Sequence, residues 1–476
     1  MSREYFRRNP WFLVALAVGL ILRTFHYLRK PAVWQDEGAL IRNVLELRSD
    51  EMFGPLLRTQ AAPPLFLVVE RAIVLILGDG EYALRLFPFL ASCLGLILFA
   101  DLVRRVLAPW SAVLAVVMIA SSDRLLWHGC EAKPYAVDFL VAVLAAYWFV
   151  RTEGWNFTRR CLSTALPAAL ALWISYPSCY VIGAFLIGLL PASRTASWLG
   201  RSSYLLMAIV VGCSFLALAK GPVAAQHNTD IASYWHSHFP NWNRPWSVPG
   251  WAVISTLEVS RYNFLPIGQV VLPFAILGGW CMIRRGEGSR VAVAILPLGL
   301  AFVASLLHRY PYGSSRLEMF AAPGLAWLAA EGAACLLPRV RNHSRYVALA
   351  LLLLLLVPIP LAAYRTIVPW PRPASDEGAA YVLIHRSPED RICVNHWEFE
   401  YYFRHEAGWR FWLGSFEAGD IPSTRGGTIW VVHTSSPTVE EFPFPIPTGW
   451  AVVEIIRFES TRVFRIRRVE IGQVPR

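Results

Sequence analysis

Charged residues are scarce in this sequence. They account for 16% of its 476 residues, whereas hydrophobic residues account for 55%; a soluble globular protein carries about 25% charged residues. This shortage argues against an ordinary soluble domain and predicts a chain that lies largely in a lipid bilayer. Paired cysteines are also missing, because the eight cysteines are scattered singly without a CxxC pair. Neither a disulfide framework nor a zinc site is therefore supported.

Positive charge is in excess in only one part of the chain. From Trp370 onward there are 12 basic and 14 acidic residues, whereas the preceding part has 32 basic and 19 acidic residues. The net charge of +11 therefore belongs to the apolar part of the chain. We expect no nucleic-acid partner on this basis.

Eleven apolar runs are candidates to cross the membrane, which takes roughly 20 residues for about 30 Å of hydrocarbon. A basic N-terminus precedes the first run without a small-residue cleavage site, so we expect this run to be retained as a span. A twelfth run, 64–78, is short and has Glu70 and Arg71 at its centre. The eleven runs are 11–28, 84–103, 107–123, 134–150, 161–175, 177–192, 202–219, 263–283, 291–307, 317–337 and 346–364.

The arginine clusters decide whether 64–78 crosses. If it does not, five clusters share the N-terminal, cytoplasmic side, as the positive-inside rule requires. If it crosses, all five move outside. We therefore expect eleven spans and a juxtamembrane helix at 64–78. The clusters are Arg104-Arg105, Arg151 with Arg159-Arg160, Arg194 with Arg201, Arg284-Arg285 with Arg290, and Arg339-Arg341-Arg345.

The remaining loops then share the outer face. They are 29–63, 124–133, 220–262 and 308–316, and the tail after 365 joins them. The 220–262 loop is rich in aromatic residues, which suits either an interfacial lid and acceptor platform or an ordinary aromatic belt.

The tail predicts a small α/β domain. Strand-like runs occur at 391–395, 428–432, 451–458 and 462–469, with a helix near 399–405. The sequence thus predicts an α-helical polytopic membrane protein with a membrane domain at 1–365 and an extracytoplasmic α/β domain at 366–476.

Two adjacent carboxylates, Asp36 and Glu37, open the first outer loop directly after the first span. Ionisable residues so close to hydrocarbon are costly and indicate function. A carboxylate in a poorly solvated pocket binds protons more tightly and suits a general base that takes a proton from a hydroxyl. The alternative is that Asp36 caps a helix beginning at Gly38.

Five segments in order on this face resemble the bacterial branch of the protein-O-mannosyltransferase family (glycosyltransferase family 39), within the multi-span superfamily that uses polyprenyl-phosphate sugar donors. The acidic motif WQDEG is followed by a proline pair, a glycine–arginine segment, a second outer loop and a late loop. These segments are 34–38, APPL at 62–65, 78–86, HGCEAKPY at 128–135 and YPYGSSR at 310–316.

The resemblance implies a division of roles. Asp36 would be the catalytic base, and Glu37 would orient it or help to hold a metal. Glu131 would be a candidate ligand for a divalent metal such as Mg²⁺ or Mn²⁺, with Asp138 as its competitor. The donor phosphate would be neutralised by three cations, which are Lys133, Arg316 and Arg309. Interfacial snorkelling is the alternative for these cations, and His308 is expected to end a span.

The sequence departs from the family at two places. Ala62 stands where eukaryotic members carry a histidine before the proline pair, and their lumenal β-trefoil insert is absent. The related lipid A aminoarabinose transferases carry a Glu-Lys pair where this chain has Ala61 and Ala62, which argues against that substrate. Protein O-mannosylation does not follow from the resemblance.

We therefore expect an inverting glycosyltransferase of the bacterial inner membrane. It would move a monosaccharide from a polyprenyl-phosphate carrier to a glycan, lipid or protein acceptor outside the cytoplasm. The rivals are a transporter or flippase of lipid-linked sugars, for which internal repeats are expected and absent, and a catalytically silent family member.

Overall fold

The computed structural model describes residues 9–227, 229–313, 316–412, 414–416, 422, 427–435 and 439–469. The basic N-terminal residues Arg3, Arg7 and Arg8 and the late-loop residues Ser314 and Ser315 lie outside the described residues. The chain forms two compact units. The first consists of 1–29 and 48–369, and the second of 30–47 and 370–476.

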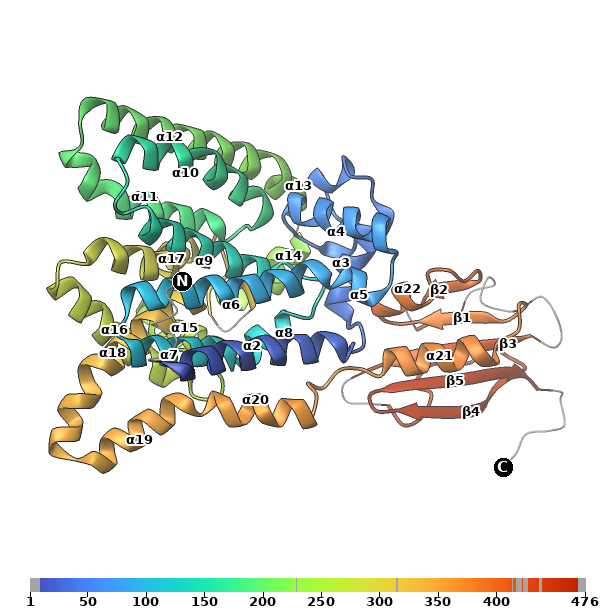
Figure 1. Cartoon of the computed structure of the whole chain (residues 1–476). Coiled ribbons are helices and arrows are strands. Elements are labelled where there is room, and N and C mark those ends of the chain that lie inside the picture. The colour runs from blue at the N-terminus through green and yellow to red at the C-terminus, as the bar shows by residue number, and fades with distance from the viewer. Residues whose placement is uncertain are drawn as a thin grey trace. The chain divides into compact units, whose positions relative to one another are not determined.

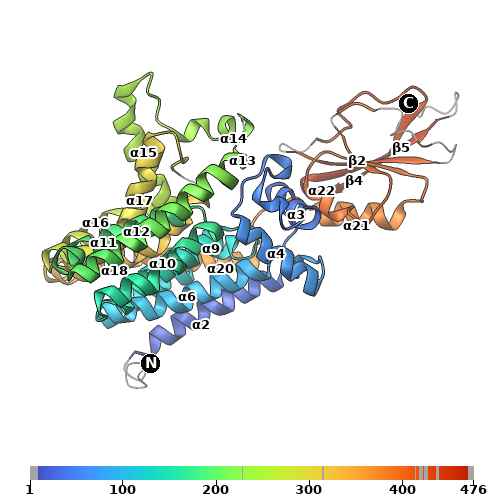
Figure 2. The same cartoon turned by 90° about the horizontal axis from the view of Figure 1, so that it is seen from above.

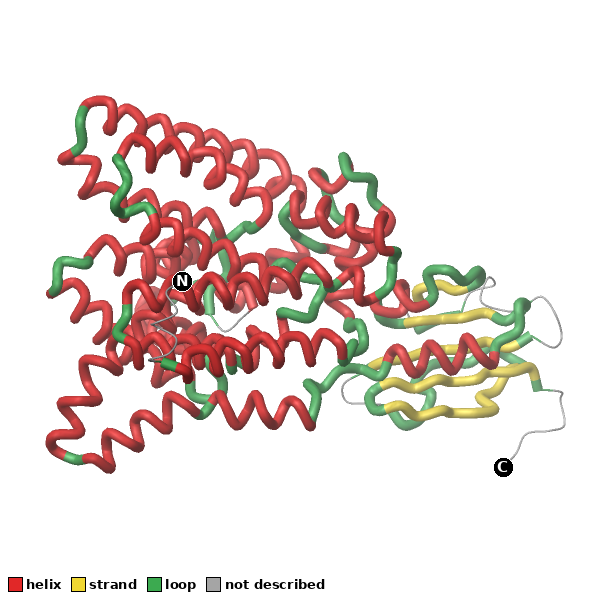
Figure 3. Tube along the Cα trace, in the orientation of Figure 1, coloured by secondary structure: helices red, strands yellow, loops and turns green. Residues whose placement is uncertain are grey.

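The first unit is built from helices, and Figure 3 shows that the strands of the described residues all lie in the second unit. All eleven predicted apolar runs form helices. The helices are α2 (Pro10–Leu28), α6 (Leu86–Val106), α7 (Pro109–Ala120), α9 (Tyr135–Arg151), α10 (Phe157–Ile174), α11 (Ser178–Thr195), α12 (Trp198–Leu218), α16 (Gly268–Arg284), α17 (Gly288–Leu306), α18 (Ala322–His343) and the pair α19 (Arg345–Leu356) and α20 (Pro358–Ile367).

The expected count of eleven spans is not confirmed. Among the described residues, seven helices are long and apolar enough to cross a membrane, or eight if a bent pair counts as one span. In that pair, 245–263 and 268–284 meet at 104°. The helix α7 has only 12 residues, too few for about 30 Å at 1.5 Å per residue. The uncertain run 64–78 forms the 14-residue helix α4 (Pro64–Leu77).

Shorter helices connect these elements. They are η1 (Glu51–Phe53), η2 (Leu57–Thr59), α5 (Glu81–Leu84), α8 (Asp123–His128), η3 (Ala219–Val223), α13 (Ala224–Gln226), α14 (Thr229–Tyr234), η4 (His236–His238), η5 (Pro245–Ser247), α15 (Val248–Asn263) and η6 (Arg316–Ala321). The aromatic-rich segment 220–262 is therefore mostly helical.

Close helix packing in the first unit depends on glycine. A Cβ atom on Gly278 of α16 would collide with the carbonyl oxygen of Leu328 in α18, and one on Gly332 of α18 would collide with that of Phe274 in α16. In a bilayer, where lipid is as apolar as leucine, small residues promote helix association by letting backbones approach. Elsewhere in this unit α10, α11 and α12 run side by side (Figures 1 and 2).

A buried arginine joins three helices at one end of the first unit. Arg23 of α2 is 1% exposed. Its Nε donates to the Ser92 hydroxyl at 2.9 Å and its Nη2 to the Ile119 carbonyl at 3.1 Å. Ile119 lies in the last turn of α7, where carbonyls lack partners within the helix. Arg23 therefore satisfies the end of α7, and its charge in an apolar helix is stabilised by hydrogen bonds rather than by an acid.

The second unit contains a five-stranded sheet in the order β2-β1-β3-β5-β4. The strand β1 pairs in parallel with β2 and β3, whereas β5 pairs antiparallel with β3 and β4. The central strand β3 is buried along its whole length, as its apolar sequence predicts. The strands are β1 (Arg391–Val394), β2 (Trp409–Phe411), β3 (Thr428–Thr434), β4 (Trp450–Phe458) and β5 (Thr461–Arg468).

Both faces of this sheet are covered. The helices α21 (Ser375–His385) and α22 (Glu398–Tyr402) pack on one face through Val382 and Phe399, and Trp412 and neighbouring aromatic side chains pack on the other. The four predicted strands and the predicted helix are confirmed within a residue or two, except that β3 continues to Thr434 and α22 ends at Tyr402. The helix α21 and the strand β2 were not predicted. The domain boundary near 365 stays a prediction, while the structure groups 30–47 with the sheet.

Candidate functional site

The acidic motif lies in the first turn of α3 (Gln35–Glu46), which belongs to the second unit. The cap residue is Trp34, and no side chain caps the helix. The alternative that Asp36 caps a helix from Gly38 is therefore wrong. Carboxylates in the first helical turn interact favourably with the helix dipole. Asp36 is half-buried, whereas Glu37 is fully buried and accepts a hydrogen bond from Arg372 at 3.0 Å.

A further carboxylate, Glu398 of α22, is buried in the same unit. Its Oε1 accepts from the Ser375 hydroxyl at 3.2 Å, and its Oε2 has no hydrogen-bond partner among the described residues. Burial raises the pKa of Glu398 from 4.5 to about 7. His396 Nδ1 lies 3.8 Å from Oε2 of Glu398, but burial dominates, so the protonated form is favoured in the folded unit.

This pKa predicts that the second unit loses stability as pH rises. Below pH 4.5 Glu398 is protonated in both states, and between 4.5 and about 7 only the unfolded chain releases the proton. The loss is of the order of 3 kcal/mol by proton linkage. We expect Glu398→Gln to remove this dependence and to be more stable than wild type at pH 8. Denaturation at pH 5 and pH 8, followed by near-UV circular dichroism, measures it; equal pH slopes in both proteins would contradict the assignment.

In the first unit, the second outer loop forms a buried polar cluster. Glu131 is fully buried. Its Oε1 accepts a short hydrogen bond from the Trp127 indole, and its Oε2 lies 2.7 Å from His128 Nδ1. The other ring nitrogen of His128 lies 2.7 Å from the Tyr262 hydroxyl at the end of α15. Burial lowers the pKa of His128, although Glu131 acts in the opposite direction. A neutral His128 then donates from Nδ1 to Glu131 and accepts from Tyr262.

Lys133 follows in the same loop and is 3% exposed. Its Nζ donates to the Gln60 side chain at 2.9 Å, so it is not a lysine extended along the surface to reach water. Gln60 directly precedes the Ala61-Ala62 pair.

The backbone beside Gln60 is fixed by two side chains from distant elements. The Gln226 amide accepts from the Ala62 nitrogen at 3.0 Å and donates to the Ala62 carbonyl at 3.1 Å. The Tyr176 hydroxyl also donates to this carbonyl, at 3.0 Å. The proline pair begins immediately after this anchored residue, which explains how a loop can hold Gln60 in place.

Arg316 joins the same region from η6. Its Nε donates to the Tyr135 hydroxyl at 2.6 Å, and its guanidinium lies 5.6 Å from the Tyr135 ring centroid. Tyr135 in turn packs edge-on against His128 at 5.1 Å between ring centroids. The structure therefore links Arg316 to the segment 128–135 through one tyrosine.

Arg309 and His308 are arranged differently. Arg309 is exposed, and within the described part of the chain it forms no hydrogen bond or ion pair with this cluster. His308 contacts the Pro240 carbonyl at 3.1 Å and stacks on Phe239. It lies two residues beyond the end of α17 at Leu306, as expected for a span-end histidine. Lys133 and Arg316 thus have buried polar partners, whereas Arg309 is exposed, and the role of all three as phosphate-binding cations stays a prediction.

The predicted metal ligands do not form a metal site in this arrangement. Both oxygens of Glu131 are engaged by Trp127 and His128, and Asp138 lies within α9 beside Ser175. No three His, Cys, Asp or Glu side chains of the described ranges are grouped to hold a metal ion. Glu131 acts here as an acceptor that orders its loop.

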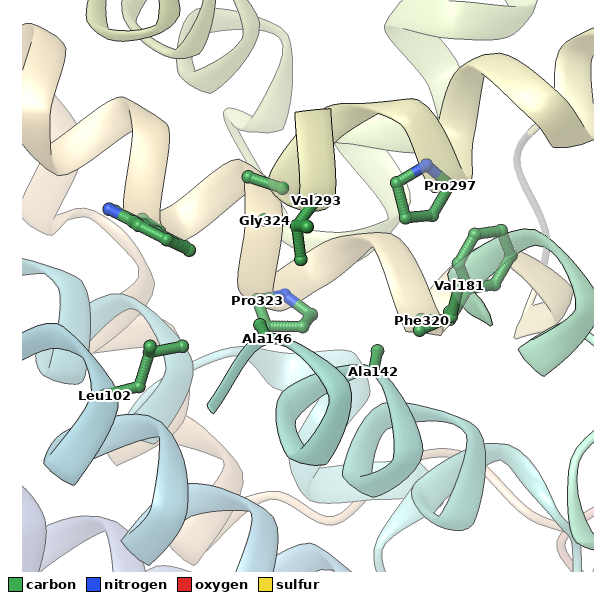
Figure 4. Close-up of a pocket in the computed structure, with 11 residues that line it drawn as sticks. Leu102, Ala142, Ala146, Val181, Val293, Pro297, Phe320, Pro323 and Gly324 are labelled. Atoms are coloured by element: carbon green, nitrogen blue, oxygen red, sulfur yellow. The ribbon is translucent and has the colours of Figure 1, made fainter. Parts of the chain in front are cut away.

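An apolar crevice lies elsewhere in the first unit (Figure 4). Its lining contains none of the predicted site residues and no charged side chain. The lining residues are Leu102, Ala142, Ala146, Val181, Val293, Ala294, Pro297, Phe320, Pro323, Gly324 and Trp327.

Sequence reasoning missed the partners of the predicted residues. Gln60, Tyr262, Gln226 and Arg372 contact the motif residues from other segments, and nothing in their local sequence indicates it. Tyr135 and His128 lie inside the motif segment 128–135. This position in the sequence was the one signal that they belong to the site.

Comparisons with known proteins agree with this arrangement. A family model described as dolichyl-phosphate-mannose-protein mannosyltransferase matches residues 61–218, which include the proline pair and the second outer loop. No curated protein matches the chain by sequence. The family resemblance predicted from the motifs is confirmed.

Solved structures show the same fold. The crystal structure of ArnT from Cupriavidus metallidurans bound to undecaprenyl phosphate has a TM-score of 0.54 at 15% identity, covering 96% of this chain and 98% of that chain. The Archaeoglobus fulgidus oligosaccharyltransferase in complex with zinc and sulfate has a TM-score of 0.51 at 11% identity, covering 89% and 68%. At these identities the two structures show the fold of this chain.

Proposed function

We propose that this protein transfers a monosaccharide from a polyprenyl-phosphate carrier to an acceptor hydroxyl outside the cytoplasm, with inversion at the anomeric carbon. The match of residues 61–218 to a family of lipid-phosphate sugar transferases carries this proposal. The similar ArnT structure was solved with undecaprenyl phosphate bound, which supports a bacterial polyprenyl carrier. A transporter is disfavoured, because the motif residues gather in buried polar clusters rather than in repeated broken helices.

The proposed reaction is a single displacement. The acceptor oxygen attacks the anomeric carbon while the bond from this carbon to the phosphate oxygen breaks. Asp36 takes the proton of the acceptor hydroxyl, and the electron pair of the broken bond leaves with the polyprenyl phosphate. Lys133 and Arg316 stabilise the phosphate as its charge develops. Attack from the face opposite to the leaving group inverts the configuration.

Residue types at the proline pair support a sugar other than aminoarabinose. The methyl side chains of Ala61 and Ala62 have no polar group that could contact a sugar. The backbone of Ala62 is already hydrogen-bonded to Gln226 and Tyr176. We therefore propose a neutral hexose or pentose as the transferred group.

Donor and acceptor identity can be tested directly. Purified protein is offered a panel of polyprenyl-phosphate monosaccharides with glycan, lipid and peptide acceptors, and products are identified by mass spectrometry. Transfer from at least one donor, with release of polyprenyl phosphate, is expected. Movement of an intact lipid-linked sugar across vesicles without cleavage would favour the transporter instead.

The proposed orientation makes a separate prediction. Ser289, next to the Arg284-Arg285 cluster, should face the cytoplasm, and Ser435 of the second unit should face the outside, because arginine clusters are retained inside. In a cysteine-free variant of the full chain, Ser435→Cys should react with an impermeant thiol reagent in intact cells and Ser289→Cys should not. Labelling of position 289 with protection of 435 would reverse the scheme.

A further inference from the structure

We propose that the C-terminal domain is a scaffold that positions the acidic helix α3, with Arg372, Arg42 and Glu400 as positioning residues for Asp36. The role of Asp36 rests on the proposed function, whereas the contacts themselves do not. The C-terminal residues contain no catalytic motif, yet residues 30–47 form one compact unit with them. Three separate sets of contacts explain this grouping.

The first contact fixes the start of α3. The Arg372 guanidinium donates through Nη1 to Glu37 Oε2 at 3.0 Å and to the Ala32 carbonyl at 3.0 Å. The Glu37 side chain is fully buried, and that of Arg372 is 6% exposed. Arg372 stands between two prolines, Pro371 and Pro373, whose rings restrict the backbone around it. A rigid segment therefore holds the Arg372 guanidinium against Glu37, the residue next to Asp36.

The second set holds the remainder of the segment. Arg42 Nη1 donates to Glu400 Oε1 at 2.6 Å, where Glu400 is 3% exposed, and the pairing raises the pKa of Arg42. Before the helix, the Val33 amide donates to the Tyr402 hydroxyl at 2.8 Å. Glu400 and Tyr402 both belong to α22. This one short helix therefore contacts the chain before the motif, at Val33, and after it, at Arg42.

The third contact explains the glycine of the motif. A Cβ atom on Gly38 would lie 2.6 Å from the Cα atom of Glu398 and 3.0 Å from the Trp397 carbonyl oxygen. Such distances are too short for any side chain, so α3 can approach the backbone of α22 only through glycine. Three successive residues of WQDEG thus have different roles. Asp36 is the candidate base, Glu37 binds Arg372, and Gly38 packs against the backbone of α22.

This geometry assigns different roles to the two carboxylates. Glu37 is fully buried and bound to Arg372, which leaves it no access to a hydroxyl substrate. Asp36, half-buried in the same turn, has its direction set by the anchored residue beside it. Small displacements of a catalytic group lower kcat strongly, so loosening the scaffold should act on kcat rather than on donor affinity.

The experiment uses the purified full chain and two readouts. Hydrogen exchange of peptides covering 35–46 should accelerate at least about tenfold in Arg372→Ala, because the anchored first turn opens. The matched control is Arg386→Ala, which breaks the Arg386–Glu406 ion pair of the same domain without touching α3; it should leave exchange at 35–46 unchanged. In transfer assays Arg372→Ala should lower kcat at least about tenfold with an unchanged KM for the donor.

A double-mutant cycle provides a second route if Arg372→Ala does not fold. Arg42→Ala and Glu400→Gln should each accelerate exchange in 35–46, and the double variant should add little to either. Unchanged exchange at 35–46 in these variants, or equal acceleration throughout the domain, would overturn the scaffold. If exchange responds as expected while wild type transfers no sugar, the scaffold stands and the proposed function fails.

Discussion

Asp36→Asn is expected to lower sugar transfer at least about 100-fold, since general-base catalysis contributes about 10²–10⁴-fold. The amide has almost the same shape but cannot take the acceptor proton. Donor binding should persist, because the cations proposed for the phosphate are Lys133 and Arg316. Initial rates with saturating donor and acceptor, together with donor binding by isothermal titration, measure both properties.

A matched control is available in the same unit. Asp376 also lies in the first turn of a helix, α21, so Asp376→Asn changes a carboxylate in an equivalent helical position outside the motif. It should retain wild-type transfer. If Asp36→Asn keeps its rate within about tenfold of wild type, another group must take the proton.

The second large effect is expected at the donor phosphate. Arg316→Ala and Lys133→Ala should each raise the KM for the lipid donor at least about tenfold, while the KM for the acceptor changes little. A guanidinium can hold phosphate through two parallel hydrogen bonds, whereas an ammonium acts as a point charge. Arg316→Lys should therefore be intermediate. Donor-titration kinetics on the three variants measure this order.

Arg309→Ala separates phosphate binding from general surface charge. Arg309 is exposed, so this variant should have a near-normal KM for the donor. Equal effects at positions 309 and 316 would show that the membrane-surface potential matters rather than a defined contact. Unchanged donor dependence in both Arg316→Ala and Lys133→Ala would place the phosphate elsewhere.

The sequence was sufficient for features that repeat along one helix or strand. Apolar runs predicted the helices of the first unit, and the buried run at 428–432 predicted a central strand. The number of membrane spans was harder to predict from the sequence. The 12-residue α7 and the bend between α15 and α16 depend on how neighbouring helices pack, and hydropathy along the chain contains no such information.

Individual contacts were the least predictable part. Arg372 and Glu37 are separated by 335 positions, and the tail seemed to be an independent domain because its own residues complete a sheet. The Glu131 carboxylate was expected to meet a metal, but nearby Trp127 and His128 occupy its oxygens. A local motif indicates which side chain is unusual, whereas only the folded chain determines which partner it finds.

The grouping of 30–47 with 370–476 has a consequence for biosynthesis. The helix α3 leaves the ribosome early, but Arg372 and α22 are translated only after all helices of residues 48–369. While the intervening membrane helices are inserted, the acidic segment therefore lacks its contacts with Arg372 and α22. A ribosome-bound chain halted before Trp370 contains the described helices of the first unit and both carboxylates of the motif, yet the motif acquires its fixed conformation only after α22 has been translated. Maturation of the proposed enzyme is thus tied to synthesis of Arg372 and α22.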